Sequence, residues 1–178
     1  MRVAIIGNSG SGKSTLAQRA VGLHRLAQLD LDTIAWKPGE TPELRETAEA
    51  AGDVRAFCES HERWVVEGCY AGLVHAALDY SPILLFLEPG VAACLTHCRS
   101  RSWEPHKYAS KAEQDQKLEF LLAWVQEYYS REGDLSLLAH QRLFDAYAGP
   151  KRKLTARGGP EVIDNLPHIE KIVAERHN

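Results

Sequence analysis

The residue types that could do chemistry begin in the first seventeen positions, where three glycines precede a lysine and a hydroxyl side chain. The segment 7–14 fits G-x-x-x-x-G-K-[ST], the phosphate-binding P-loop, in which backbone N–H groups and the lysine surround phosphate oxygens. Glycine lets the backbone approach the phosphate, and the hydroxyl suits Mg²⁺. We therefore predict one nucleotide-binding segment, made of Gly7, Asn8, Ser9, Gly10, Ser11, Gly12, Lys13, Ser14 and Thr15.

Three carboxylates stand where short apolar strands are expected to end. Asp30 and Asp32 follow the run 26–29, and Glu67 lies near the end of the run 63–68. The carboxyl ends of parallel strands meet at the crevice where α/β sheets bind ligands. The two aspartates would hold hydrated Mg²⁺ or accept a proton from a substrate hydroxyl; alternatively, both cap the following turn. Glu67 either joins them or is a solvated side chain beside a turn glycine.

Other side chains near these acids are candidates to contact a substrate. Gly68 would let the backbone approach a ligand, and Tyr70 would stack on it or donate a hydrogen bond. Trp36 is either an aromatic lid or a satellite of the core. The predicted substrate site is Asp32, Trp36, Glu67, Gly68 and Tyr70.

Positive charge gathers in the segments 99–107 and 151–157. Arg99 and Arg101 follow the most apolar predicted strand, where a lid would carry guanidinium groups to a phosphate; a solvated basic loop is the alternative. The run from Lys151 to Lys153 either contacts the nucleotide or is solvated.

The composition indicates one domain of 178 residues with a formal charge of −3, from 21 basic and 24 acidic residues. This balance disfavours nucleic acid and anionic membranes as partners. We expect a cytoplasmic protein, because no apolar run approaches the ~20 residues of a membrane span. The four cysteines are expected to be reduced thiols rather than zinc ligands: Cys58, Cys69, Cys94 and Cys98.

Hydrophobic periodicity predicts alternating strands and helices. Strands are expected at 3–6, 26–29, 63–68, 83–87 and 161–165. Helices are expected at 15–23, 73–78, from 91 onward, 111–129, 135–140 and 167–175, and over 43–61, which Pro42 could open.

These features together resemble the adenylate-kinase-like P-loop kinases. The likeness rests on the P-loop, Leu29-Asp-Leu-Asp32, Trp64-Val-Val-Glu-Gly-Cys-Tyr70 and the arginines after the fourth strand. The wording around the P-loop is most similar to the small topology-modulation proteins, also described as adenylate-kinase-related ATPases. The resemblance implies an α/β P-loop NTPase fold: a three-layer sandwich with a five-stranded parallel sheet in the order 2-3-1-4-5. It also implies a single domain, 1–178, with a helical lid inserted at roughly 99–115.

The resemblance assigns roles as well. By likeness to shikimate kinase, Asp30 supports Mg²⁺ with Ser14, Asp32 holds the acceptor hydroxyl, and Arg99 and Arg101 are lid arginines.

The chain also departs from its look-alikes. The topology-modulation pattern Asp-Gly-Asn-Tyr is here Glu67-Gly-Cys-Tyr70, and the glycine triplet of shikimate kinase is absent, which argues against shikimate as substrate. The nucleotide-selective arginine of monophosphate kinases would be Arg45 or Arg55, provided that it faces the crevice.

The residues favour a kinase that moves the γ-phosphoryl of Mg·ATP onto a hydroxyl-bearing metabolite or a nucleoside monophosphate. Lys13, Asp32, Arg99 and Arg101 would be catalytic. The paired aspartates favour a hydroxyl acceptor, because a monophosphate needs cations around it. The alternative is a nucleotide-dependent binding protein acting on a protein or DNA partner. A GTPase is disfavoured, because no N-K-x-D tetrapeptide occurs.

Overall fold

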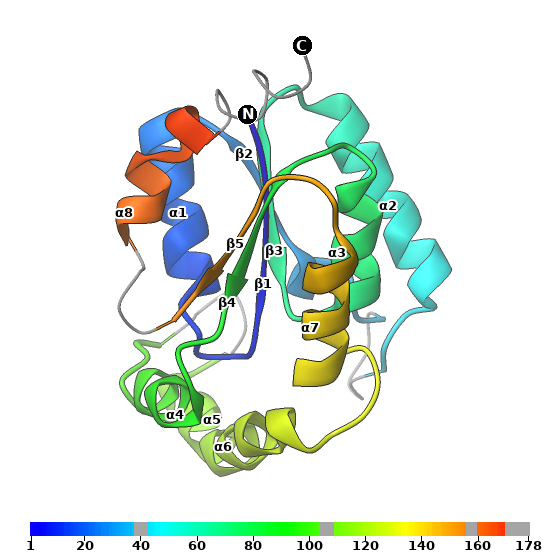
Figure 1. Cartoon of the computed structure of the whole chain (residues 1–178). Coiled ribbons are helices and arrows are strands. Elements are labelled where there is room, and N and C mark those ends of the chain that lie inside the picture. The colour runs from blue at the N-terminus through cyan, green and yellow to red at the C-terminus, as the bar shows by residue number, and fades with distance from the viewer. Residues whose placement is uncertain (38–42, 104–108, 156–159, 170–178) are drawn as a thin grey trace.

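The computed structural model describes residues 1–37, 43–103, 109–155 and 160–169 (Figure 1). At its centre is a five-stranded sheet in the order β2-β3-β1-β4-β5, with every pairing parallel. The strands are β1 (Arg2–Gly7), β2 (Ala27–Asp30), β3 (Trp64–Gly68), β4 (Ile83–Leu87) and β5 (Lys151–Leu154). The predicted fold class and strand order are confirmed.

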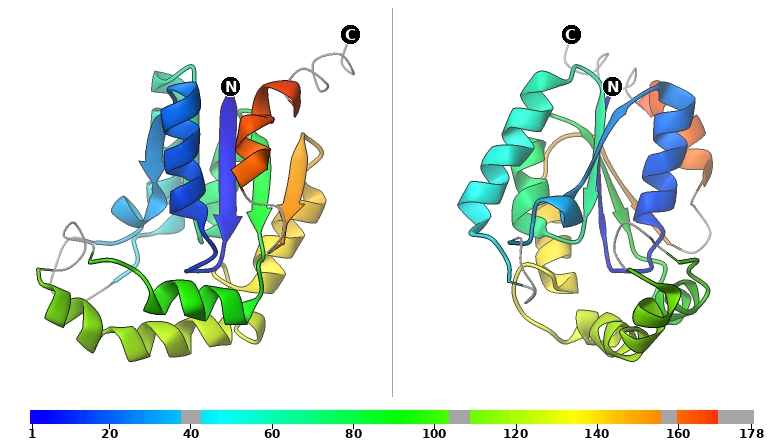
Figure 2. Two further views of the ribbon diagram at one scale, coloured as in Figure 1. Left: turned by 90° about the vertical axis from the view of Figure 1, so that its left-hand side faces the viewer. Right: turned by 180° about the vertical axis from the view of Figure 1, so that it is seen from behind.

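Helices cover both faces of the sheet and its carboxyl edge (Figures 1 and 2). One face carries α1 (Lys13–His24) and α8 (Pro160–Asp164); the other carries α2 (Thr47–Ser60), α3 (Ala71–Leu78) and α7 (Leu137–Ala146). Across the carboxyl ends of the strands lie α4 (Val91–Arg99), α5 (Lys111–Gln116) and α6 (Leu118–Gln126). Two 3₁₀ turns, Leu31–Thr33 and Glu127–Tyr129, follow β2 and α6. No helix in the described part of the chain is both long and apolar enough to cross a membrane.

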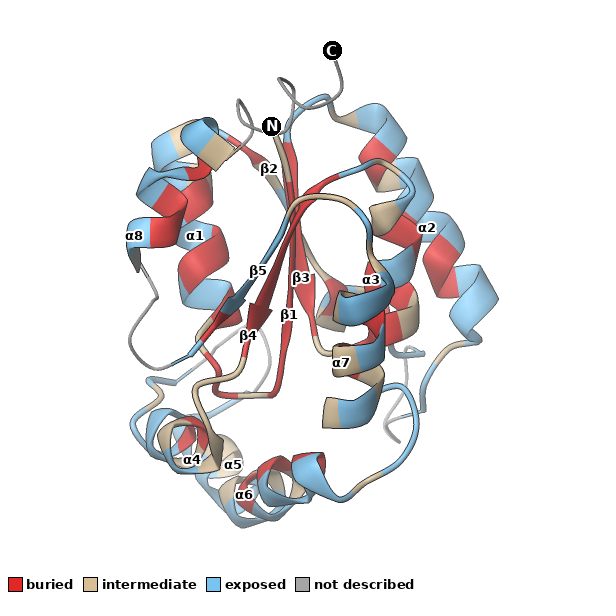
Figure 3. Ribbon diagram, viewed as in Figure 1, coloured by how far each residue is buried: buried red, intermediate tan, exposed pale blue. Residues whose placement is uncertain are grey.

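The central strands are buried along almost their whole length (Figure 3). Such continuous apolar runs suit a parallel sheet that is covered on both faces. Separate apolar clusters fill the two faces, and a third cluster joins α4 to α6 through Cys94, Cys98, Leu122 and Val125. The helices over the carboxyl edge therefore have a small core of their own.

The sequence prediction is wrong about the fifth strand. β5 is the basic segment Lys151–Leu154, whereas residues 160–164, at the predicted strand, form α8. Three of the four side chains of β5 are exposed, as at the edge of a sheet, so no apolar run marks it. The apolar residues assigned to a strand, Val162 and Ile163, are buried against α1 instead.

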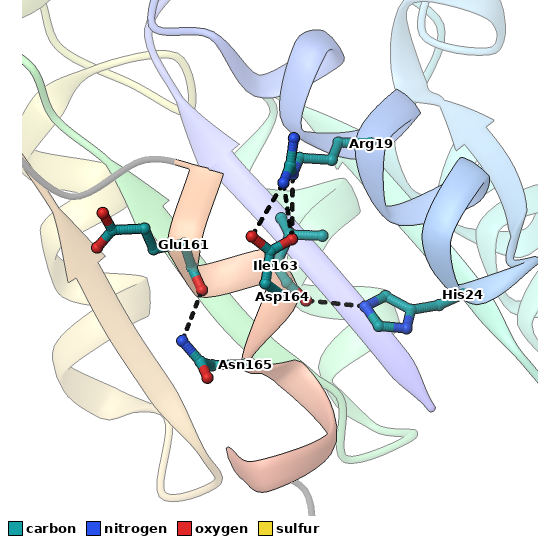
Figure 4. A network of polar contacts seen from close by, with 6 residues as sticks. All are labelled: Arg19, His24, Glu161, Ile163, Asp164 and Asn165. Carbon is teal, nitrogen blue, oxygen red and sulfur yellow. Dashed lines mark hydrogen bonds and ion pairs between the residues drawn. The ribbon is translucent and has the colours of Figure 1, made fainter.

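Polar contacts accompany this docking of α8 (Figure 4). The Arg19 guanidinium donates to both carboxylate oxygens of Asp164, at 2.8 and 2.9 Å, and His24 Nε2 lies 2.8 Å from the Ile163 carbonyl oxygen. Because the side chains of the ion pair are nearly half exposed, the pair adds little stability. Burial of apolar side chains is the main reason that α8 packs here.

Several helix boundaries differ from the prediction. α2 begins at Thr47, because Trp36 and Leu44 form an antiparallel bridge that keeps the chain before it extended. The helix expected over 111–129 is divided at Lys117. Residues 166–169 are helical, and the rest of the helix predicted to end at 175 lies outside the described residues.

Candidate functional site

The P-loop connects β1 to α1 at the carboxyl edge of the sheet. Gly10 and Gly12 have φ values of 73° and 97°, in the left-handed region that favours glycine. A Cβ on Gly10 would also lie 2.4 Å from the Cys94 carbonyl oxygen and 2.7 Å from Cys98 Sγ. The two buried cysteines of α4 therefore pack directly against the loop and help to fix its shape.

Lys13 is nearly buried in the first turn of α1. Its Nζ donates to the Asn8 carbonyl oxygen at 2.9 Å. The Asn8 side chain accepts from Ser9 N at 2.8 Å and donates to the Val125 carbonyl oxygen of α6 at 3.0 Å, so the loop is also fixed to α6. Ser11 Oγ is buried, and no described residue forms a hydrogen bond with it. A buried ammonium and an unpaired hydroxyl at a helix N-terminus fit phosphate oxygens.

Glu67 lies beside the P-loop. It pairs in register with Asp30 of β2 and with Ile5 of β1 and is 2% exposed. Its Oε1 has no hydrogen-bond partner among the residues that the structure describes. Burial raises the pKa of Glu67, whereas Lys13 and a hydrogen bond with Ser14 lower it. Sequence reasoning assigned Glu67 to the substrate, but in the structure it neighbours Lys13 and Ser14.

The two aspartates have different positions: Asp30 ends β2, and Asp32 lies within the 3₁₀ turn that follows. Asp30 Oδ1 accepts from Asp32 N at 2.9 Å and so caps the 3₁₀ turn, as one of the predicted alternatives had it. Asp32 does not serve as this cap; its Oδ1 accepts a hydrogen bond from the Tyr70 hydroxyl at 2.8 Å. The backbone at Gly68 approaches a side chain rather than open space, because a Cβ there would lie 2.7 Å from Leu31 Cβ. Gly68 thus fits β3 against the turn that carries Asp32.

A pocket of about 270 Å³ adjoins Tyr70, between the start of α2, α3 and the segment after α6. Arg45 lines it, which meets the condition set for a selective arginine, but its guanidinium is bound to Glu49 and Asp53. Arg55 is not among the residues that line the pocket. Its Nε lies 3.9 Å from Asp79 Oδ2. The polar lining is Arg45, Thr47, Tyr70, Arg131, Glu132 and Asp134.

Arg131 is the residue of this pocket that the sequence analysis missed. Its guanidinium stacks on Trp124 at 3.7 Å from the ring centroid and donates to the Trp124 carbonyl oxygen, while its buried Nε has no hydrogen-bond partner in the described part of the chain. Burial lowers the pKa of Arg131. The described residues include no carboxylate in an ion pair with it, although the other pocket arginine has two. Nothing in the local sequence distinguishes Arg131, because only the fold brings it beside Tyr70.

The other candidates, Trp36, Arg99 and Arg101, are not among the residues that line this pocket. Trp36 is 40% exposed, and its Nε1 donates to the Tyr70 hydroxyl at 2.9 Å. Arg99 is the exposed last residue of α4, and Arg101 is half-buried just beyond it. Helix α4 is held near the P-loop by His97, whose Nδ1 lies 2.8 Å from the Gly10 carbonyl oxygen. Residues 104–108 of the predicted lid lie outside the described part of the chain.

The basic run in β5 has structural partners. Lys151 Nζ donates to three carbonyl oxygens at the end of α7, at 2.6 to 2.9 Å, and so caps that helix. Lys153 Nζ forms an ion pair with Glu88 at 2.7 Å. Neither lysine is merely solvated.

A buried histidine fixes the loop between Gly68 and Tyr70. His140 Nε2 lies 2.8 Å from the Cys69 carbonyl oxygen, and its Nδ1 lies 2.8 Å from the Tyr128 hydroxyl. Because a carbonyl only accepts, Nε2 carries the proton and Nδ1 accepts from Tyr128. Burial lowers the pKa of His140 to about 4. The neutral imidazole therefore connects β3 to the segment after α6.

This burial predicts acid sensitivity. In the unfolded chain, His140 binds a proton as the pH falls below 6.5. In the folded chain it binds that proton only near pH 4. His140 should therefore lower the free energy of unfolding by about 3 kcal/mol between pH 7 and pH 4. Chemical denaturation across that range should show a shallower pH dependence in His140→Gln than in wild type. His75→Gln, at an exposed position, is the control and should retain the wild-type slope. If His140→Gln does not fold, NMR titration of the wild-type imidazole gives the same test, and a His140 pKa near 6.5 would contradict it.

Comparisons with known proteins agree with this architecture. No protein-family model matches the chain, and no curated protein matches it in sequence. A gluconokinase from Sinorhizobium meliloti 1021 aligns with a TM-score of 0.55 and 14% identity over 99% of this chain and 95% of that one. A shikimate kinase from Bacteroides thetaiotaomicron aligns with a TM-score of 0.54 and 13% identity over 96% of this chain and 98% of that one. An uncharacterized protein from Eubacterium ventriosum ATCC 27560 aligns with a TM-score of 0.52 and 16% identity over 96% and 98% of the two chains.

At these identities the likeness concerns the fold. The chain has the α/β P-loop NTPase fold, which it shares with these structures. These comparisons do not support the narrower resemblance to adenylate-kinase-like or topology-modulation proteins.

Proposed function

We propose that the protein is a kinase that transfers the γ-phosphoryl group of Mg·ATP to a hydroxyl group of a small anionic metabolite. The observation that carries the proposal is the arrangement at one edge of the sheet. Lys13 of the P-loop is buried, and Asp32 accepts a hydrogen bond from Tyr70, which lines the pocket. The same pocket contains Arg131, which has no ion pair with a carboxylate among the described residues. Phosphoryl transfer depends on positioning and on charge stabilisation, and these residues suit both.

The nucleotide side of the site fits Mg·ATP. Backbone N–H groups of the P-loop and Lys13 would bind the phosphates, and the Ser14 hydroxyl would contact Mg²⁺. Among the described residues no group of three or more His, Cys, Asp and Glu side chains is placed to hold a metal. Mg²⁺ would therefore take most ligands from phosphates and water. Glu67, which interacts with Ser14, and Asp30, which pairs with Glu67 in register, are the carboxylates that would bind that water. When bound, Mg·ATP supplies the electrophilic γ-phosphorus.

The acceptor side begins at Asp32. The acceptor oxygen would form a bond to the γ-phosphorus while the bond to the β,γ-bridging oxygen breaks, so that ADP leaves. Asp32 would take the hydroxyl proton, which the phosphorylated product no longer carries. Arg99 and Arg101, at the end of α4, are the proposed cations that approach the transferred group when the lid closes.

Arg131 supports an anionic acceptor. Removing a cation from water is costly unless an anion compensates it, and the described residues give Arg131 no ion-pair partner. A guanidinium binds a carboxylate or phosphate group through paired hydrogen bonds. Gluconate and shikimate, named by the structural neighbours, are hydroxylated carboxylates of this class, and nucleoside monophosphates are the phosphate counterpart.

The function is tested by ADP release with Mg·ATP across matched acceptors. Gluconate is paired with neutral sorbitol, shikimate with its methyl ester, and adenosine monophosphate with adenosine. We expect ADP release to rise with an anionic member of one pair and not with its neutral partner. Retained ATP binding with no stimulation by any acceptor would instead favour the nucleotide-dependent binding protein.

Replacing Arg131 with Met should raise the acceptor KM about 30-fold, because a hydrogen-bonded charge is lost from the pocket. Neither the KM for ATP nor kcat at saturating acceptor should change by more than about threefold. Arg142→Met is the matched control, since Arg142 is exposed on α7 outside the pocket lining. Equal acceptor KM values in the two variants would exclude Arg131 from acceptor binding.

A further inference from the structure

A chain of two hydrogen bonds leads from the rim of the pocket to the proposed catalytic carboxylate. Trp36 Nε1 donates to the Tyr70 hydroxyl at 2.9 Å, and that hydroxyl donates to Asp32 Oδ1 at 2.8 Å. The three residues come from different places: Trp36 and Asp32 flank the end of the first 3₁₀ turn, and Tyr70 follows β3. The fold therefore creates this chain, which we call the Trp36–Tyr70–Asp32 relay.

The direction of the relay is fixed by chemistry. An indole N–H only donates, a phenol has a single proton to donate, and an ionised carboxylate only accepts. Because Trp36 occupies an acceptor site on the phenol oxygen, the phenol proton is directed to Asp32. Tyr70 is 5% exposed, and burial raises its pKa above the ordinary range, so it keeps its proton.

The backbones that carry the phenol and the carboxylate are fixed as well. Gly68 packs so closely on Leu31, the residue before Asp32, that no Cβ fits between them. The carbonyl oxygen of Cys69, the residue before Tyr70, is bound by the buried His140. Both ends of the Tyr70–Asp32 hydrogen bond are thus attached to rigid structure, which is what precise orientation of a catalytic group requires.

We propose that Tyr70 is a positioning residue for phosphoryl transfer: it holds one oxygen of Asp32 and so orients the carboxylate toward the acceptor hydroxyl, while Trp36 orients Tyr70. This inference rests on the proposed function of Asp32 and extends it to two residues that need not touch the reacting atoms. A carboxylate that loses this hydrogen bond is held less firmly about χ2 and meets the hydroxyl in the productive geometry less often, so loss of the relay lowers kcat.

The kinetic test uses Tyr70→Phe, which keeps the aromatic ring but removes the hydroxyl. We expect kcat to fall about tenfold while the KM values for ATP and acceptor stay within threefold. In an Asp32→Ala background there is no carboxylate to orient, so adding Tyr70→Phe should lower kcat no further. Trp36→Phe should lower kcat about threefold, and only when Tyr70 is present. Tyr147→Phe is the control: it removes another tyrosine hydroxyl, bonded to the Pro82 carbonyl oxygen at 2.5 Å away from the site, and should leave kcat unchanged.

A second measurement is independent of any acceptor. The indole N–H resonance of Trp36, assigned with Trp36→Phe, should shift in Tyr70→Phe and also in Asp32→Ala, because the Tyr70 hydroxyl is hydrogen-bonded to both Trp36 and Asp32. Wild-type kcat in Tyr70→Phe, or an equal loss with and without Asp32, would overturn the positioning role even if the kinase is real. An indole resonance unaffected by both substitutions would overturn the relay itself. If no acceptor is phosphorylated but the resonance shifts in both variants, the proposed kinase fails while the hydrogen-bonded relay stands.

Discussion

Lys13→Ala should abolish phosphoryl transfer, with kcat lowered at least about 10³-fold, while leaving the fold intact. In the structure Lys13 Nζ is held 2.9 Å from the Asn8 carbonyl oxygen, among backbone N–H groups placed to bind phosphate. An ammonium in this position stabilises the negative charge that develops between the β- and γ-phosphates, and electrostatic stabilisation of this kind is often the largest contribution to catalysis.

The fold should tolerate this substitution because Lys13 has a titratable neighbour. Without the ammonium, the buried Glu67 loses a charge that lowers its pKa, so the carboxyl group takes up a proton more readily instead of remaining a buried anion. Thermal denaturation should therefore change by only a few degrees. Lys117→Ala, at an exposed lysine between α5 and α6, should retain full turnover. Undiminished ADP release by folded Lys13→Ala protein would refute the kinase assignment.

The P-loop and its partners were predictable because their constraints are local. Gly10 and Gly12 have positive φ values, which glycine favours, and Lys13 begins the helix that follows the loop after a buried strand. The residue types at these positions therefore indicate the structure that is observed. The acids at the strand ends were predictable for a similar reason: parallel strands bring their carboxyl ends to one edge. Thus Asp30 and Glu67 pair in register, although 37 positions separate them.

The acceptor pocket was not predictable in the same way. Arg131 becomes distinctive only when α6 is laid across the strand ends and Trp124 covers its guanidinium. β5 was not predicted for a related reason. It is an edge strand of exposed lysines and one arginine, and such a strand has no apolar periodicity. Even Tyr70 was predicted to stack on a substrate or to donate a hydrogen bond to it, whereas its observed acceptor is Asp32. These features depend on contacts between residues that are far apart in the sequence. A residue pattern shows the residues themselves but not which of them meet in the fold.

Asp32→Asn should lower kcat about 100-fold or more, because an amide has nearly the same shape as the carboxylate but cannot take up the acceptor proton. The amide oxygen can still accept from the Tyr70 hydroxyl, so the side chain should keep its place. ATP binding, measured by titration calorimetry, should stay within twofold of wild type. Asp79→Asn, an exposed aspartate at the end of α3, is the control for loss of one negative charge.

Asp30→Asn separates the two aspartates chemically. Asp30 caps the 3₁₀ turn and lies across from Glu67, on the side proposed for Mg²⁺, so its replacement should raise the Mg²⁺ concentration needed for half-maximal rate. Excess Mg²⁺ should then restore much of the activity of Asp30→Asn but none of that lost in Asp32→Asn. If Mg²⁺ restored the Asp32 variant instead, the proton acceptor would have to be sought elsewhere and Asp32 would belong to the metal side. The contrast matters because the two side chains are only two positions apart, yet one is bonded to its own turn and the other to Tyr70.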